Sequence, residues 1–109
     1  MQITQITPDY SVAPQIYPGD IAALREQGFR TIICNRPDDE EPGQPDWETI
    51  ATAAEAEGLE AHHLPIGPDI SVEAQKANFA RIYADAPKPI LAYCRTGNRS
   101  TLIHDAVNG

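Results

Sequence analysis

The chain has 109 residues, of which 41% are hydrophobic and 22% charged, an ordinary balance for a globular protein that excludes a disordered chain. This length suits a single domain, residues 1–109, with one real hydrophobic core. Sixteen acidic and eight basic residues give a formal net charge of −8, which argues against nucleic acid as a partner because phosphate backbones are bound by basic surfaces.

Short β-type runs alternate with helix-type segments along the chain. The predicted strands are residues 2–7, 11–15, 30–35, 59–64 and 90–93. The predicted helices are residues 18–27, 46–57 and 71–84, and a final helix from about residue 100. This order predicts an α/β fold: one three-layer domain with a mostly parallel central sheet flanked by helices on both faces.

Targeting signals are not evident in this sequence. The first residues lack a basic and then apolar leader, and no apolar run approaches the length of a membrane span. The two cysteines, Cys34 and Cys94, do not form the disulfide framework of a small secreted domain. We therefore expect a reduced, cytoplasmic protein without a membrane partner.

The most informative segment follows the last predicted strand and reads Cys94-Arg95-Thr96-Gly97-Asn98-Arg99-Ser100. We call residues 94–100 the cysteine loop. Backbone N–H groups of a tight turn that opens a helix converge on an anion, and arginines add permanent positive charge. Both effects favour the thiolate of Cys94, which is the reactive form of a cysteine nucleophile. We predict that residues 95–99 bind an anion and that Ser100 hydrogen-bonds the Cys94 sulfur.

Ligands of α/β folds bind beyond the carboxyl ends of the parallel strands. The connections there are residues 35–43, 65–70 and 94–99, and we expect them to line one crevice with Cys94 at its floor. Arg36 lies near the start of the first connection. It could reach the crevice and bind the substrate anion, and pairing with Asp38 or Glu40 is an equal alternative.

Two resemblances follow from these residues. The cysteine loop resembles the active loop of rhodanese-type sulfurtransferases. From about residue 15 to 100 the chain resembles the phosphatase-like domain of the beta-lactamase hydrolase-like proteins, most specifically in Asn35-Arg36-Pro37-Asp38 and the cysteine loop. The resemblance implies a dual-specificity-phosphatase-like fold and a cysteine nucleophile acting in phosphate or sulfur chemistry. It also implies an association with persulfide dioxygenase or sulfide-oxidising enzymes.

The spacing within the loop favours sulfur. Tyrosine phosphatases and their relatives place five residues between the cysteine and the arginine, whereas four separate Cys94 from Arg99. A shorter loop narrows the cradle that a phosphoryl group needs but still fits one sulfur atom. The main prediction is therefore a sulfurtransferase: Cys94 takes sulfane sulfur from thiosulfate or a small persulfide and passes it to an acceptor thiol. The predicted substrate is a small anionic sulfur donor, and no cofactor is required.

The alternative prediction is a phosphatase with a Cys94 phosphocysteine intermediate, acting on a phosphoester. Such an enzyme needs a general acid for the leaving group, and Asp69 is the candidate, although a turn role is favoured for it. A second alternative is a non-catalytic redox or docking module. His62, His63 and His104 lack zinc spacing, so no metal site is predicted, and Cys34 is expected in the core.

Overall fold

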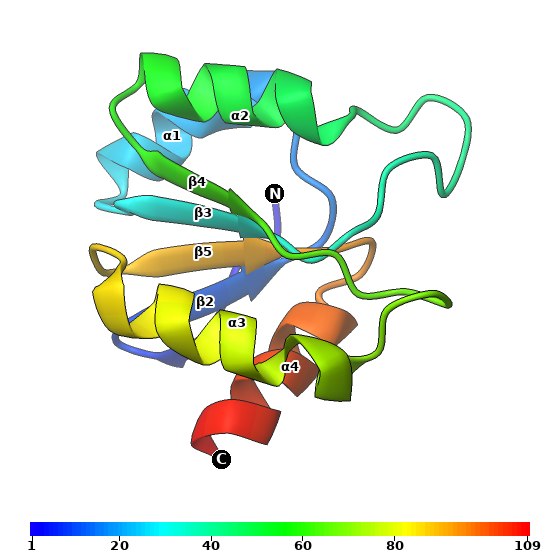
Figure 1. The fold of residues 1–109 in the computed structure, drawn as a ribbon. Helices are drawn as coiled ribbons and strands as arrows, with labels where there is room; N and C mark the ends of the chain where they lie inside the picture. The colour runs from blue at the N-terminus through cyan, green and yellow to red at the C-terminus, as the bar shows by residue number, and fades with distance from the viewer.

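A computed structural model describes residues 1–109 as a five-stranded sheet between two pairs of helices (Figure 1). The strands are β1 (Thr4–Thr7), β2 (Tyr10–Ala13), β3 (Thr31–Cys34), β4 (Glu60–His63) and β5 (Ile90–Tyr93). The helices are the 3-10 helix η1 (Pro18–Asp20), α1 (Ile21–Glu26), α2 (Trp47–Ala56), α3 (Val72–Asp85) and α4 (Asn98–Asn108). No helix has the length and apolarity needed to cross a bilayer.

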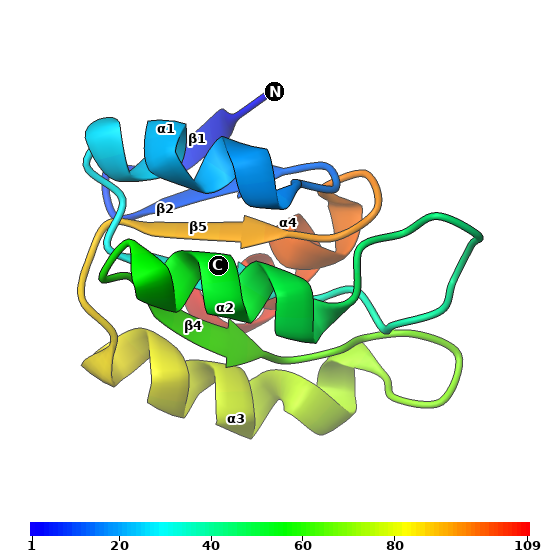
Figure 2. The same ribbon diagram turned by 90° about the horizontal axis from the view of Figure 1, so that it is seen from above.

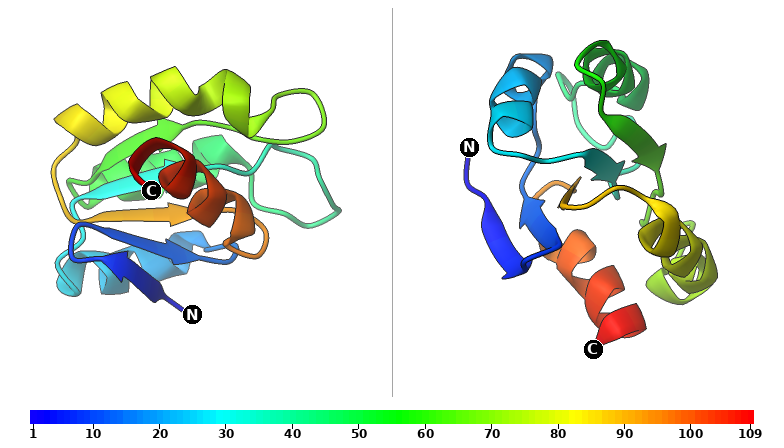
Figure 3. Two further views of the ribbon diagram at one scale, coloured as in Figure 1. Left: turned by 90° about the horizontal axis from the view of Figure 1, so that it is seen from below. Right: turned by 90° about the vertical axis from the view of Figure 1, so that its left-hand side faces the viewer.

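The sheet has the order β1-β2-β5-β3-β4, in which β1 alone runs antiparallel to its neighbour. Helices α1 and α2 cover one face and α3 and α4 the other, as the view along the strands shows (Figure 3). This arrangement confirms the predicted three-layer α/β fold with a mostly parallel sheet.

The side chains of the central strands point alternately to the two faces of the sheet, which explains why helices cover both faces. Within β5, Leu91 and Tyr93 enter the core on the α1–α2 side, whereas Ile90 and Ala92 enter the core on the α3–α4 side. Successive side chains of a strand point to opposite faces, so a strand that is apolar throughout needs a layer on each side.

The functional consequence lies at the carboxyl ends of these strands. The connections after β3, β4 and β5 all emerge at the same end of the sheet, where the long β3–α2 connection projects farthest (Figure 2). Backbone hydrogen bonds join them, because Ile66 N–H donates to Asn35 and Asn35 N–H donates to Tyr93. The three connections predicted to line one crevice therefore meet at this end of the sheet, but neither hollow there is lined by all three, and Cys94 lines neither.

Candidate active site

Strand β5 delivers Cys94 to the end of the sheet and α4 begins directly after it. The Cys94 side chain is fully buried, and its N–H donates to the Ala13 carbonyl at 3.4 Å. The chain turns at Gly97, whose φ of 95° lies in the left-handed region that glycine adopts without strain. Helix α4 begins directly after this turn, at Asn98, two residues before the predicted start. The N–H groups of its first residues therefore form part of the cysteine loop.

The sulfur of Cys94 lies among backbone N–H groups. Burial raises the pKa of the Cys94 thiol, but hydrogen bonds from the N–H groups of Ser100, Thr96, Arg99 and Gly97 oppose it, and the net shift is below the ordinary value. The Gly97 N–H donates to the sulfur at 3.0 Å. The loop amides therefore stabilise the thiolate, the form that acts as a nucleophile.

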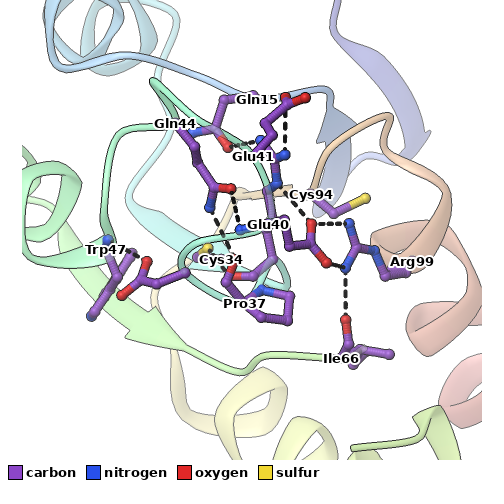
Figure 4. A network of polar contacts seen from close by, with 12 residues as sticks. Gln15, Cys34, Pro37, Glu40, Glu41, Gln44, Trp47, Ile66, Cys94 and Arg99 are labelled. Carbon is purple, nitrogen blue, oxygen red and sulfur yellow. Dashed lines mark hydrogen bonds and ion pairs between the residues drawn. The ribbon is translucent and has the colours of Figure 1, made fainter. Parts of the chain in front are cut away.

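Arg99 occupies one wall of the site, where it joins all three connections (Figure 4). Its Nη1 donates to Glu40 Oε2 at 2.7 Å and to the Ile66 carbonyl at 2.8 Å, and its Nη2 donates to Glu40 Oε1 at 2.9 Å. The hydrogen bonds with Glu40, followed by the nearby charges of Glu40 and Cys94, raise the pKa of Arg99. The guanidinium therefore carries its positive charge beside the thiolate.

Arg36 is a buried partner of the same carboxylate. Its Nε donates to Glu40 Oε1 at 2.8 Å, its Nη1 to Gln15 Oε1 and its Nη2 to Glu41 Oε1, both at 3.0 Å. The structure thus shows the pairing alternative, with Glu40 and Glu41 as partners, while Asp38 accepts from the Trp47 N–H. An anion-binding role for Arg36 stays a prediction.

Glu40 therefore lies between two arginines. Hydrogen bonds from Arg99 and Arg36 lower the pKa of its carboxyl to about 2 against the opposing effect of burial. Sequence reasoning missed this residue as part of the site. The available signal was that two arginines in the crevice of an acidic chain require carboxylate partners, and Glu40-Glu41 follows Arg36 in the same connection.

Ser100 contributes to the site through its backbone. Its N–H is the first of the four backbone groups that lower the pKa of Cys94, whereas its hydroxyl donates to Asn35 Oδ1 at 2.8 Å. The Asn35 amide donates in turn to the Leu64 carbonyl at 2.9 Å, and the Ser100 carbonyl accepts from the Tyr10 hydroxyl at 2.7 Å. Asn35, the first residue of the Asn35-Arg36-Pro37-Asp38 motif, thereby fixes the start of α4 beneath the cysteine loop.

Other residues of the cysteine loop face a hollow on its N-terminal side. Arg95 and Thr96 line a hollow of about 280 Å³ together with Gln2 and Thr4 of the N-terminal segment. Asn98 N–H donates to Thr96 Oγ1 at 3.3 Å.

Asp69 lies away from these residues. It is exposed in the turn between Gly67 and Ile70, and it borders a smaller hollow of about 140 Å³ that also touches Pro37. The structure gives Asp69 no hydrogen bond to the cysteine loop, and its role as an acid stays a prediction.

Cys34 and His63, for which no catalytic or metal-binding role is predicted, both contact the backbone of the β3–α2 connection. Cys34 is buried, as expected, and donates from its thiol to the Arg36 carbonyl at 3.2 Å; burial raises its pKa to about 11. His63 stacks on Trp47 with ring centroids 5.3 Å apart and lies 3.1 Å from the Arg36 carbonyl. Both therefore support the connection that carries Glu40.

Comparison with known proteins places these features in a family. The family model described as "Beta-lactamase hydrolase-like protein, phosphatase-like domain" matches residues 2–107. A beta-lactamase hydrolase-like protein of Agrobacterium fabrum is 34% identical over 104 residues, which are 95% of this chain and 24% of that protein. Its counterpart from Xylella fastidiosa is 29% identical over the same lengths. The chain thus spans about a quarter of the length of these curated relatives.

Solved structures agree with this assignment. A candidate phosphatase from Neisseria meningitidis is 36% identical, with a TM-score of 0.85 over 94% of this chain and 73% of that one. A candidate phosphatase from Shewanella putrefaciens, 20% identical, superposes with a TM-score of 0.76 over 96% of this chain and 66% of that one, and shows the shared fold. The chain therefore belongs to the phosphatase-like domain family of the beta-lactamase hydrolase-like proteins.

Proposed function

We propose that this domain is a cysteine-dependent phosphatase that hydrolyses phosphomonoesters through a Cys94 phosphocysteine. The observation that carries the proposal is the buried Cys94 sulfur, which accepts a hydrogen bond from the Gly97 N–H of the cysteine loop and lies beside Arg99 in a phosphatase-like fold. The same set of donors suits the oxygens of a phosphoryl group that is being transferred to the sulfur. The predicted order of preference, sulfur before phosphate, is thereby reversed.

The reaction has two steps. The thiolate attacks phosphorus, an S–P bond forms, and the ester P–O bond breaks with its electron pair leaving on the alcohol oxygen. Water then attacks phosphorus, the S–P bond breaks, and inorganic phosphate and the thiolate are released. Asp69, which borders the hollow beside Pro37, is proposed to protonate the leaving oxygen in the first step and to accept a proton from water in the second.

Sulfur transfer remains the second candidate because one observation favours it. Four residues separate Cys94 from Arg99, as in the rhodanese loop. In that reaction Cys94 attacks the sulfane sulfur of a donor, the donor's sulfite or thiol leaves, and an acceptor thiol takes the sulfur from the Cys94 persulfide. Either reaction needs a free thiolate, so we expect the domain to work in a reducing compartment such as the cytoplasm. A persulfide dioxygenase would be a partner only if the domain is a sulfurtransferase.

One experiment separates the two reactions. The protein is incubated with an aryl phosphate and, separately, with thiosulfate or glutathione persulfide, and turnover and intact mass are measured for the wild type, Cys94→Ser and Asp69→Asn. We expect phosphate release that disappears in Cys94→Ser and falls on the order of a hundredfold in Asp69→Asn for poor leaving groups. A gain of one sulfur atom that depends on Cys94, without phosphate release, would establish the second candidate. Reaction with neither would leave a non-catalytic module.

A further inference from the structure

Glu40 lies on the connection between β3 and α2, 59 residues from Arg99 in the chain, and holds that arginine on the wall of the site (Figure 4). We propose that Glu40 is a positioning residue: it binds the Nη1–Nη2 edge of the Arg99 guanidinium and thereby presents the adjacent Nε–Nη2 edge to an anion at Cys94. The inference deepens the phosphatase function proposed above, since it concerns how the same site binds its anion.

The N–H groups of Arg99 can be counted. A guanidinium carries five N–H donors in a planar fork. Three of them are used: the two on Nη1 donate to Glu40 and to the Ile66 carbonyl, and one on Nη2 donates to Glu40. The remaining two, on Nε and Nη2, lie parallel on the same edge of the fork. Two parallel N–H groups match two oxygens of a phosphoryl group.

The free edge is directed toward the nucleophile. Cys94 raises the pKa of Arg99 through its charge and through a side-chain hydrogen bond, after the larger effect of Glu40, so the two groups are close. In Figure 4 Cys94 and Ile66 are drawn on opposite sides of the Arg99 fork, with Nη1 on the Ile66 side. The edge that carries Nε and the second Nη2 proton is therefore the one available to a group bound on the sulfur.

Glu40 is itself fixed from the other side. Arg36, whose side chain is 1% exposed, donates to Glu40 Oε1 and is anchored by Gln15 and Glu41. Two arginines keep the Glu40 carboxyl ionised down to a pKa of about 2. The Glu40 carboxylate is thus a charged acceptor whose position is fixed by Arg36. Because Glu40 is fixed, it can in turn fix the orientation of Arg99.

The charge of Glu40 acts against its proposed role, and this makes the role testable. A carboxylate beside an anion-binding loop repels the anion. Glu40 can favour anion binding only through the arginine that it orients. Removing its charge should therefore weaken anion binding while Arg99 is present and should not weaken it once Arg99 is absent.

The test is a double-mutant cycle that measures the dissociation constant of tungstate by calorimetry, with wild type, Glu40→Gln, Arg99→Ala and the double variant. Glutamine has the shape of glutamate, but its amide cannot accept from both nitrogens of the Arg99 edge. We expect Glu40→Gln to weaken tungstate binding on the order of tenfold in the wild-type background, the loss of about one charge-assisted hydrogen bond. In the Arg99→Ala background we expect it to leave the dissociation constant unchanged or lower.

Glu73→Gln is the control for the loss of charge. Glu73 lies on α3, its side chain is 81% exposed, and it pairs with Lys76 at 3.4 Å and with none of the site residues. The substitution removes the same charge, and we expect less than a twofold change in the dissociation constant in either background. Melting temperatures of all variants report folding, and Glu40→Asp, one methylene too short to reach both arginines, serves if Glu40→Gln unfolds.

Other results would overturn the proposal. Tighter tungstate binding for Glu40→Gln in both backgrounds would mean that Glu40 acts only as a through-space charge. Equally weaker binding in both backgrounds would mean a general structural role. A wild type that does not bind tungstate would mean that Arg99 presents no edge to an anion. A wild type that binds tungstate but releases no phosphate from an aryl ester would reject the proposed phosphatase function alone. The double-mutant cycle would still test the positioning role of Glu40.

Discussion

Cys34 ends β3, Cys94 follows the neighbouring strand β5, and both are buried, yet the pKa values of their thiols shift in opposite directions. Burial raises both. Cys34 receives few compensating contacts and its pKa reaches about 11, whereas four backbone N–H groups surround the sulfur of Cys94 and lower its pKa. At the scale of the residue, the nucleophile is therefore distinguished by the backbone that follows it and not by its exposure.

Gly97 tests this dependence on the backbone. Its φ of 95° is strained for any residue with a Cβ, and its N–H donates to the Cys94 sulfur. We expect Gly97→Ala to lower the free energy of unfolding by about 1–2 kcal/mol and to raise the pKa of Cys94, because the strained turn moves this donor. Urea denaturation measures the first effect, and the pH dependence of alkylation by iodoacetamide measures the second.

Gly43→Ala is the control for backbone strain alone. Gly43 has a φ of 81°, lies in the exposed β3–α2 connection and would place its Cβ in open space. It should lose a similar free energy of unfolding and leave the alkylation profile unchanged. An unchanged profile for Gly97→Ala as well would contradict the role assigned to the loop amides.

At the scale of the elements, the site depends on how closely the β3–α2 and β4–α3 connections approach each other. A Cβ built on Gly67 would lie 2.9 Å from Cγ of Pro37 and 4.0 Å from Oε2 of Glu40. Pro37 belongs to the connection that carries Glu40, and Gly67 follows Ile66, whose carbonyl accepts from Arg99. The missing side chain at Gly67 thus lets both partners of Arg99 lie together.

We therefore expect Gly67→Ala to push the two connections apart and to cost about 1–3 kcal/mol in the free energy of unfolding, the range for overpacking. Aryl phosphate hydrolysis should fall with it, since Arg99 loses a partner on one side. Gly19→Ala, whose Cβ would meet nothing within 4 Å, is the control and should change neither quantity appreciably. Equal effects of the two substitutions would contradict the close approach described here.

At the scale of the whole molecule, the strands and helices could be predicted from the sequence, whereas contacts between residues far apart in the chain could not. Strand β5 is apolar at every position and β3 at every position but Thr31, and caps such as Ser71 and Asp46 mark helix starts, so the layers could be predicted locally. The contact between Glu40 and Arg99 could not, because several carboxylates of the same connection could reach an arginine. The hydroxyl of Ser100 likewise binds Asn35, 65 residues away, and not the adjacent sulfur.

His104 of α4 packs against Tyr10 of β2 and Tyr83 of α3, so its protonation should affect the stability of the whole fold. It is 6% exposed, stacks on Tyr10 with ring centroids 4.3 Å apart, and its buried Nε2 has no hydrogen-bond partner. Burial lowers its pKa below 6.5, an effect that Asp105 only partly opposes. The unfolded chain therefore takes up this proton at a higher pH than the folded protein does.

The sign of the effect follows from this difference. Stability from the neutral His104 is fully present above about pH 6.5 and is lost as the pH falls through the lowered folded value. We expect the free energy of unfolding, measured by urea titration, to decline below pH 6.5, and His104→Phe, which keeps an aromatic ring against Tyr10, to reduce that decline. His62→Gln removes a histidine on β4 that is 32% exposed and should retain the decline. A wild-type profile that His104→Phe leaves unchanged would mean that other groups set the acid limit, since the buried imidazole would then cost nothing on protonation.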